Sequence, residues 1–191
     1  TKNTLAVLNF ENLSDPADSE RQGDIIAELL TTDLSASEFV KVVSSQRLYD
    51  LVKQEGGEAN AKIDRGEAIR IARKAGTTRM LTGALSKLSG RSIITAQIVD
   101  VSSGEVIGSE RVDGNDLFAM VDDLSIRIKR RVGLSETHAL AGDIPVSEAT
   151  TSNPAAYRAY LEGMERYHAL DWDDAHKHFD RAIKLDSTFA L

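Results

Sequence analysis

The stretch Thr4-Leu5-Ala6-Val7-Leu8-Asn9-Phe10, residues 4–10, is short and largely apolar. A continuous apolar run of this length is typical of a strand that is buried on both faces of a sheet. A polar loop follows at residues 11–20, and a second strand is predicted at residues 39–43. Residues 21–37 between them have a helical period, with one apolar stripe made of Ile25, Ile26, Leu29, Leu30 and Leu34. This strand-helix-strand order favours parallel pairing through a right-handed crossover.

Two shorter helices are predicted next, because each is bracketed by residues that start and stop helices. Ser44 or Ser45 can cap a helix that ends at Gly56-Gly57. After a polar insert, Asp64 can cap another helix, which ends just before Gly76. The residues expected to face inward are Leu48, Leu51 and Val52 in the first of these helices, and Ala68, Ile71, Ala72 and Ala75 in the second.

Three strands in close succession complete the predicted sheet. In chain order they cover residues 78–88, 91–101 and 105–112. The dipeptides Ser89-Gly90 and Ser103-Gly104 separate them, and such tight turns between strands of alternating polarity indicate antiparallel hairpins. A helix at residues 115–132 then closes the domain. The order β-α-β-α-α-β-β-β-α predicts an α/β (α+β) fold, in which helices pack on a mixed sheet of about five strands.

The C-terminal residues 153–191 carry a helical pattern of their own. Ala175, Phe179 and Ala182 follow the spacing A-x3-F-x2-A, and Trp172 stands three residues before Ala175. This pattern resembles the second helix of a tetratricopeptide repeat (TPR), a helical hairpin of about 34 residues that normally stacks in arrays. The resemblance implies that residues 153–191 are the first repeat of a longer array. The side chains expected to pack within this all-α hairpin are Tyr160, Met164, Trp172, Ala175, Phe179 and Ala182.

Several motifs between residues 4 and 133 resemble the TolB amino-terminal-like domain, and they occur in the same order. Residues 5–14 (LAVLNFENLS) resemble the opening of that domain, with Asn9 where the family usually has proline. The other matching segments are residues 23–35, 82–85, 94–100 and 103–105. The resemblance implies a TolB-like domain at residues 1–133, similar in fold to the curli-secretion protein CsgG, and a linker at residues 134–152.

The same resemblance bears on function. TolB-like domains often precede TPRs in multidomain bacterial sensors and regulators, next to nucleotide cyclase, winged-helix or kinase domains. The family offers no catalytic residues that could be carried over to this chain.

The polar loop after the first strand is the candidate ligand site. It lies between the carboxyl end of a parallel strand and the start of a helix, where open α/β sheets bind ligands. The side chains that predict a ligand, cation or partner site are Glu11, Asn12, Ser14, Asp15 and Asp18. The alternative is an acidic loop in solvent, whose carboxylates favour the positive end of the following helix.

Composition narrows the classes of function. The 23 basic and 30 acidic residues give a net charge of −7, which argues against a non-specific nucleic-acid binder. A basic cluster at Arg127, Lys129, Arg130 and Arg131 could bind an acidic partner, but we expect it to be solvated and to offset the negative end of its helix. The chain has no cysteine, which excludes disulfides, thiol catalysis and cysteine-bound zinc. No apolar run approaches the ~18–20 residues of a membrane span, so no membrane insertion is expected within this chain.

Motifs of catalytic, cofactor or metal sites are missing from the sequence. Neither glycine-rich nucleotide-binding motif occurs. His176 and His178 are two positions apart, which points them to different faces of a helix. The spacing of Ser, His and Asp residues suggests no triad, although distant positions can build one. We therefore expect no catalytic, cofactor-binding or metal-binding residues.

The preferred interpretation is a non-catalytic protein-interaction or sensory module of a larger bacterial TPR protein. It would bind a protein or peptide through the TPR groove and couple it to a neighbouring effector domain. The alternative is a structural component of a CsgG-like cell-envelope assembly, and a hydrolase or transferase is disfavoured. A periplasmic position, as the extracytoplasmic region of a membrane-anchored bacterial protein, is favoured over a cytoplasmic one. A single repeat also leaves an apolar face that would allow a homodimer through the C-terminal helices.

Overall fold

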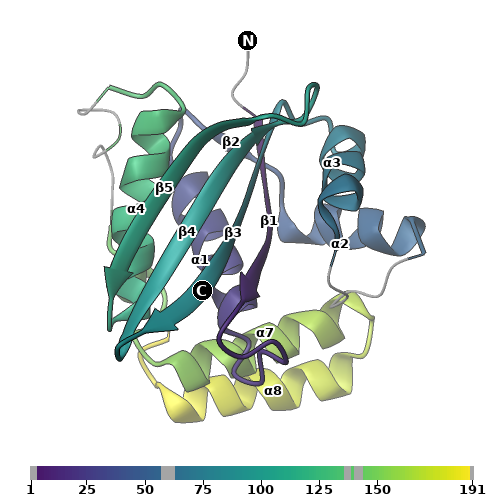
Figure 1. Cartoon of the computed structure of the whole chain (residues 1–191). Coiled ribbons are helices and arrows are strands. Elements are labelled where there is room, and N and C mark those ends of the chain that lie inside the picture. The colour runs from purple at the N-terminus through teal and green to yellow at the C-terminus, as the bar shows by residue number, and fades with distance from the viewer. Residues whose placement is uncertain (1–3, 57–62, 136–138, 140–143, 190–191) are drawn as a thin grey trace.

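The part of the chain that the structure describes, residues 4–56, 63–135, 139 and 144–189, forms a sheet flanked by helices in a computed structural model (Figure 1). The strands are β1 (Thr4–Asn12), β2 (Lys41–Val42), β3 (Arg79–Leu88), β4 (Arg91–Asp100) and β5 (Val106–Gly114). The helices are α1 (Gln22–Ala36), α2 (Ser45–Gln54), α3 (Arg65–Lys74), α4 (Leu117–Arg131), α6 (Val146–Ala149), α7 (Pro154–His168) and α8 (Trp172–Leu185).

The sheet is mixed and five-stranded, which confirms the predicted fold class. Its order is β2-β1-β3-β4-β5. β1 runs parallel to both β2 and β3, while β3, β4 and β5 are antiparallel neighbours. Ser44 and Asp64 cap α2 and α3 by accepting backbone N–H bonds, as predicted. Gly90 and Gly104 have φ of 80° and 75°, so each turn uses its glycine for a left-handed backbone.

The second strand is much shorter than predicted. It was expected at residues 39–43, but β2 covers Lys41–Val42 alone. The last backbone bond of its ladder is donated by the Val43 N–H to the Leu5 carbonyl at 2.9 Å. Ser44 then caps α2, and the chain turns away from the sheet edge before more residues can pair.

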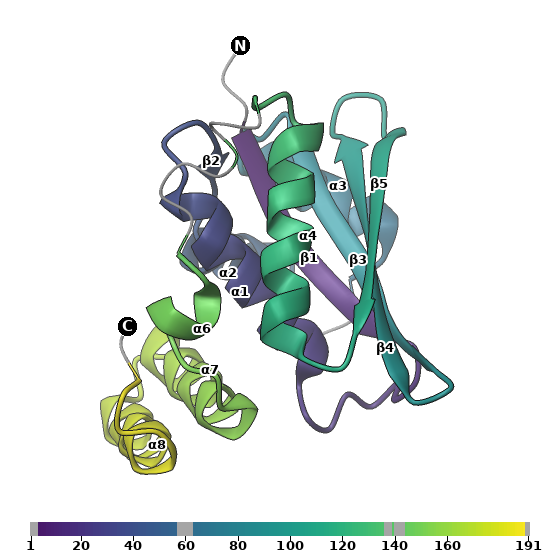
Figure 2. The ribbon, with the colours of Figure 1, turned by 90° about the vertical axis from the view of Figure 1, so that its left-hand side faces the viewer.

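The side chains of β1 alternate between two hydrophobic cores. Leu5, Val7 and Phe10 belong to the core that contains α1 and α4, whereas Ala6 and Leu8 belong to the core under α2 and α3. Figure 2 shows α1 and α4 together on one side of the sheet. The predicted apolar stripe of α1 is almost completely buried, and its members are Ile25, Ile26, Leu29, Leu30 and Leu34.

The basic cluster of α4 differs from the prediction at Lys129. This residue was expected to be solvated, but its side chain is 3% exposed and its Nζ donates to Oδ1 of Asp33 in α1 at 2.8 Å. Lys129 lies at helical spacing from the buried Ser125 and therefore faces the core. Arg127 behaves more as expected, because it pairs with Asp123 at the helix surface. The buried pair connects α4 to α1.

α7 and α8 form a helical hairpin, and α7 is the member that packs on the α/β part of the chain (Figure 1). Tyr157 of α7 is fully buried in the same core as α1, and its ring lies edge-on to that of Phe118, with 6.4 Å between centroids. Within the hairpin, a Cβ atom at Gly163 would lie 2.5 Å from the Phe179 ring. Glycine at this position is therefore what lets α8 approach α7 so closely.

The predicted linker at residues 134–152 contains the short helix α6. Val146 is buried, and its N–H donates to Oδ1 of Asp122 in α4 at 2.9 Å. The segment is therefore attached to the α/β part near α4. Parts of several predictions lie outside the described residues, namely the polar insert with Gly57 (57–62), linker residues 136–138 and 140–143, and residues 190–191 at the end of the predicted repeat.

Candidate functional site

Asn12 and Asp18 organise the loop that follows β1. The amide N–H of the buried Asn12 donates to Oδ1 of Asp18 at 2.8 Å. The two carboxylate oxygens of Asp18 accept the backbone N–H groups of Gln22 at 3.0 Å and Gly23 at 2.8 Å. Asp18 thus satisfies free donors at the start of α1, and its charge favours the positive end of that helix. These contacts are the ones expected from the alternative to a ligand site, in which the carboxylates of the loop favour the positive end of the following helix.

Ser14 and Asp15 hold the outer part of the same loop. Both donate their backbone N–H to Oδ1 of Asn12, and the Ser14 hydroxyl oxygen accepts the N–H of Lys87 at 2.7 Å. The side chain and backbone of Ser19 both donate to Asp15, which lowers the pKa of this carboxyl group. Of the predicted site residues, Glu11, Asn12 and Asp18 line the cavity described next, and Ser14 and Asp15 do not.

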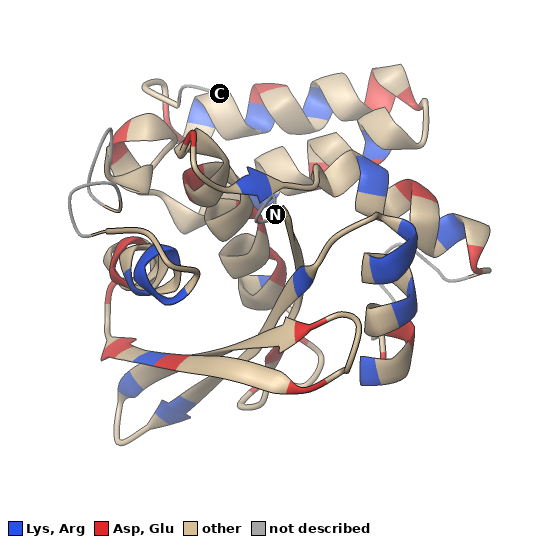
Figure 3. Cartoon of the chain, turned by 90° about the horizontal axis from the view of Figure 1, so that it is seen from above, with Lys and Arg blue, Asp and Glu red and all other residues tan. Residues whose placement is uncertain are grey.

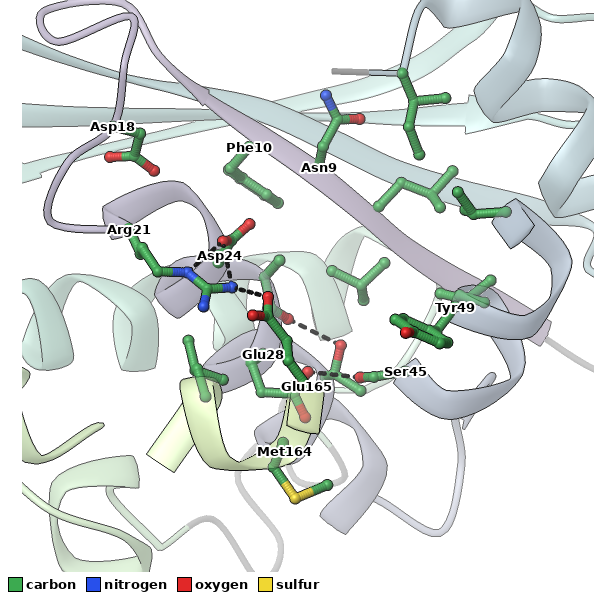
Figure 4. Close-up of a pocket in the computed structure, with 18 of the residues that line it drawn as sticks. Asn9, Phe10, Asp18, Arg21, Asp24, Glu28, Ser45, Tyr49, Met164 and Glu165 are labelled. Carbon is green, nitrogen blue, oxygen red and sulfur yellow. Dashed lines mark hydrogen bonds and ion pairs between the residues drawn. The ribbon is translucent and has the colours of Figure 1, made fainter. Parts of the chain in front are cut away.

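A cavity of about 850 Å³ lies beside β1, between α1, α2 and the docked helix α7 (Figure 4). β1 contributes residues 7–12, which include the carboxyl end of a parallel strand, the region where open α/β sheets bind ligands. The loop after β1 was predicted to be at such a site. The contributions of α2 and α7 were not expected, and α7 supplies Leu161, Met164, Glu165 and His168.

Arg21 joins the α/β part to α7 at one end of the cavity. Its backbone is left-handed, with φ of 53°, and its guanidinium donates to Asp24 of α1 at 2.9 Å and to Glu165 of α7. Figure 4 shows the guanidinium between these two carboxylates. One positive charge is thus shared by two negative charges, and the cluster as a whole is acidic.

Glu28 lies deeper in the cavity and connects α1 to α2. Its Oε2 accepts the hydroxyl of Ser45 at 2.5 Å, the one hydrogen bond of its side chain within the described residues. Burial raises the pKa of Glu28; the Ser45 hydrogen bond opposes this rise, and the charge of Asp24 adds to it. Glu28 is therefore a carboxyl group that a cationic or hydrogen-bonding ligand could stabilise.

Tyr157 and Tyr160 of α7 and the cavity residue His168 are uncharged near neutral pH. Burial and the nearby Glu28 raise the pKa of Tyr160 to about 12, and the same two causes raise the pKa of the buried Tyr157. Burial lowers the pKa of His168, whose ring lies 5.6 Å from the ring of Tyr49. The net charge of the cavity is consequently set by its carboxylates and Arg21.

The residues expected to pack within the C-terminal repeat have different environments. Ala175 and Ala182 are buried, and the rings of Phe179 and Tyr160 are 5.9 Å apart. Met164 lines the cavity. Trp172 differs most from the expectation, because it is 55% exposed at the first turn of α8 and its ring packs edge-on against that of Tyr167, 5.0 Å away.

None of the most prominent polar residues of the cavity was singled out in the sequence as a site residue, and Ser45 was named only as a candidate helix cap. They are Arg21, Asp24, Glu28, Ser45 and Glu165. One local signal was present for Glu28, which lies between Ile25 and Leu29 of the buried stripe and must therefore border the core. No local signal connects Arg21 with Glu165, which are 144 positions apart.

Within the described residues, no group of three or more His, Asp or Glu side chains is arranged to hold a metal ion. The helices of that part of the chain are also too short or too polar to cross a membrane.

No protein-family model matches this chain. In sequence, 99% of the chain aligns, at 24% identity over 200 residues, with 31% of putative adenylate cyclase 3 from Rhizobium meliloti (strain 1021). The chain therefore spans about a third of the length of this relative.

Solved structures resemble the chain in fold. The LpoB C-terminal domain from Salmonella enterica superposes with a TM-score of 0.52 and 23% identity, over 60% of this chain and 83% of that domain. Two further solved structures are less similar in fold to this chain. TolB from Acinetobacter baumannii has a TM-score of 0.43 and 16% identity, over 70% of this chain and 29% of TolB. Lipoprotein GNA1162 from Neisseria meningitidis has a TM-score of 0.49 and 14% identity, over 70% of this chain and 99% of the lipoprotein. The chain is therefore similar in fold to the LpoB C-terminal domain.

Proposed function

We propose that this chain is a non-catalytic protein-interaction region of a larger bacterial protein. The observation that carries the proposal is the α7–α8 hairpin, which is docked through Tyr157 while other side chains of the hairpin present apolar surface to solvent. The exposed apolar residues are Tyr167, Leu170, Trp172, Ile183 and Leu185. Exposed apolar surface of this kind is typical of protein contacts, and Trp and Tyr contribute most to many of them.

The partner is proposed to be a protein rather than a nucleic acid. Figure 3 shows Lys and Arg interspersed with Asp and Glu on the described helices. The net charge of −7 would repel a phosphate backbone.

The neighbouring effector is proposed to be a nucleotide cyclase domain. Support comes from the alignment with putative adenylate cyclase 3, in which almost the whole chain corresponds to less than a third of a longer protein. In such a protein this chain would be a regulatory region, and partner binding to it would alter the output of the cyclase.

The finer proposal is that α7 and α8 are the first repeat of a TPR array with a groove for a protein or peptide. The burial of Ala175 and Ala182 and the contact of Phe179 with Gly163 are consistent with the close helix packing that such a repeat needs. The exposed Ile183 would then contact the following repeat. Without that repeat, the same face would favour a homodimer, so analytical ultracentrifugation should show weaker self-association for a longer chain that includes it.

A second candidate is a structural component of a CsgG-like assembly in the cell envelope. The similarity of fold to the LpoB C-terminal domain favours this candidate over the repeat-based sensor. The envelope candidate depends on the fold of the α/β part, whereas the repeat-based sensor needs an array of helical repeats. Ring-shaped particles in mass photometry of the full-length protein would support it. Both candidates are proposed to work outside the cytoplasm, with a cytoplasmic position as the alternative.

Site-specific photo-crosslinking tests the main proposal. A photoreactive amino acid is placed at Trp172 of the full-length protein, and a matched control is placed at Glu105, which is exposed in the β4–β5 turn. We expect one protein partner to be crosslinked reproducibly from position 172 and not from position 105. The proposal would be reversed if neither position captured a partner while the purified chain converted ATP or another substrate in an activity screen.

A further inference from the structure

Within the described residues, the edge of β1 that borders the cavity has no strand paired with it beyond its second residue. β2 pairs with Thr4 and Leu5 alone. Backbone groups of successive residues point to alternate sides of a strand. The Leu5 carbonyl faces β2, so the N–H and C=O of Val7 face the same way, past the end of β2. Outside the strand ladders, none of the described residues forms a hydrogen bond with these two groups, although Val7 is only 4% exposed.

Such a pair of backbone groups points to a particular kind of ligand. Buried N–H and C=O groups are nearly always paired, and an unpaired strand edge is a ready template for another strand. Val7 lines the cavity together with Asn9, which lies within the register shift between Val7 and Phe10. An extended peptide lying along β1 can accept the Val7 N–H with one of its carbonyl groups and donate one of its own N–H groups to the Val7 carbonyl.

The charges around the cavity indicate which side chain such a peptide would carry. Asp24, Glu28 and Glu165 line the cavity, and Arg21 is already paired with two of them. Glu28 has the Ser45 hydroxyl as its hydrogen-bond partner. A cationic side chain would therefore be attracted into the site and an acidic one repelled.

Apolar walls accompany these carboxylates. Leu48 of α2 and Leu161 and Met164 of α7 contribute apolar surface to the cavity. Apolar side chains on either side of a basic residue would therefore find matching surface. Because α7 forms one wall, the site is complete only while the hairpin is docked.

We infer that this groove binds a short extended segment of a protein partner, paired with β1 at Val7 and carrying a Lys or Arg side chain toward Glu28 and Asp24. This surface is separate from the exposed residues of the α7–α8 hairpin. Peptide binding in the groove therefore does not depend on the function proposed for the hairpin.

NMR titration of the 15N-labelled chain tests the inference. The probe is a pool of degenerate pentapeptides with Lys fixed at the centre, and a matched pool has Glu at the centre. We expect saturable shifts of the Val7 and Asn9 amides, and of amides in α1 and α2 around Glu28 and Ser45, with the Lys pool alone. Equal binding of the Glu pool, or no saturable shift at Val7 up to about 1 mM peptide, would overturn the inference.

Variants separate the charge contribution from the backbone contribution. The double variant Glu28→Gln with Asp24→Asn should bind the Lys pool about tenfold more weakly. Glu38→Gln, which alters an exposed carboxylate outside the cavity, should bind it as the parent chain does. A Lys pool that is N-methylated next to the central residue should lose the shift at Val7, because it cannot donate to the strand. Circular dichroism verifies that each variant is folded. Unchanged binding of the N-methylated pool would contradict pairing of the peptide with β1.

Discussion

The guanidinium of Arg21 is hydrogen-bonded to the carboxylate of Glu165, although the two residues are 144 positions apart. Arg21 precedes α1 in the α/β part of the chain, and Glu165 lies in the last turn of α7. Their side chains are 19% and 30% exposed. This contact is a direct polar connection between the α/β part and the C-terminal hairpin, and it forms one end of the cavity.

A double-mutant cycle measures the contribution of this contact. Arg21→Ala and Glu165→Ala should each lower the free energy of unfolding, and the double variant should lose less than the sum of the two. We expect a coupling energy of about 1 kcal/mol from urea unfolding, because the pair is partly shielded from water. The more exposed pair Arg91–Asp113 is the matched control and should show a coupling close to zero. Equal coupling energies for the two pairs would contradict the proposed role of Arg21.

Gly163→Ala should destabilise the hairpin even though alanine normally favours a helix. The added Cβ would lie 2.5 Å from the Phe179 ring, so α8 would have to move away from α7. We expect a loss of about 1 kcal/mol or more in unfolding free energy, where helix propensity alone would predict a gain. In a Phe179→Leu background the same substitution should cost clearly less. A stabilising effect of Gly163→Ala in the parent chain would show that the contact is looser than described.

Glu28→Gln should stabilise the chain at neutral pH. Burial raises the pKa of Glu28 above its ordinary value of 4.5. The favourable contribution of this group to folding stability is therefore fully present below about pH 4.5 and is lost as the pH rises through the raised pKa. Glutamine cannot ionise. The melting temperature of the variant should therefore exceed that of the parent at about pH 7, and the difference should shrink as pH falls toward 4.5.

Ser45→Ala provides the matched test of the same carboxyl group. It removes the hydrogen bond that lowers the pKa of Glu28, so the destabilisation of the chain with rising pH should become steeper. Melting curves of parent, Glu28→Gln and Ser45→Ala between about pH 4 and 8 measure both effects. Parallel pH profiles for the three chains would contradict the described environment of Glu28.

Gly104→Val should weaken the hairpin between β4 and β5. Gly104 has φ of 75°, and its added side chain would also press on Ile69 Cδ1, 3.3 Å from the Cβ position. A β-branched residue is strained in the left-handed region, and we expect a loss of about 1 kcal/mol or more. Gly104→Asn, which tolerates this backbone, should cost much less when both variants are compared by thermal unfolding.

The elements of the α/β part could be predicted because their signals are local. The apolar stripe of α1 with Leu29 at its centre, the caps at Ser44 and Asp64, and the glycine turns at Gly90 and Gly104 each depend on a few neighbouring residues. Such patterns indicate period and turn type without knowledge of tertiary contacts. The hairpins then determine the antiparallel half of the sheet.

The cavity could be located only in part. Its position beside the loop after β1 was predicted from strand direction, whereas its polar residues come from elements that meet through tertiary packing, as Glu28 and Ser45 do. Lys129 shows a related difficulty, since a lysine on a helix is usually solvated and Asp33, 96 positions away, is what makes its burial tolerable. Trp172 was assigned to packing by its spacing, but its first-turn position leaves it largely exposed.

The docking of α7 on α1 underlies both the orientation of the hairpin and the wall of the cavity, and native-state hydrogen exchange tests it most directly. If the hairpin and the α/β part unfold as one unit, the amides of Tyr157 and Leu161 in α7 should report the same opening free energy as those of Leu29 and Leu30 in α1, to within about 1 kcal/mol. Arg21→Ala should lower the protection of the α7 amides more than that of the α1 amides. Rapid exchange throughout α7 in the parent chain, while α1 stays fully protected, would contradict the docked arrangement.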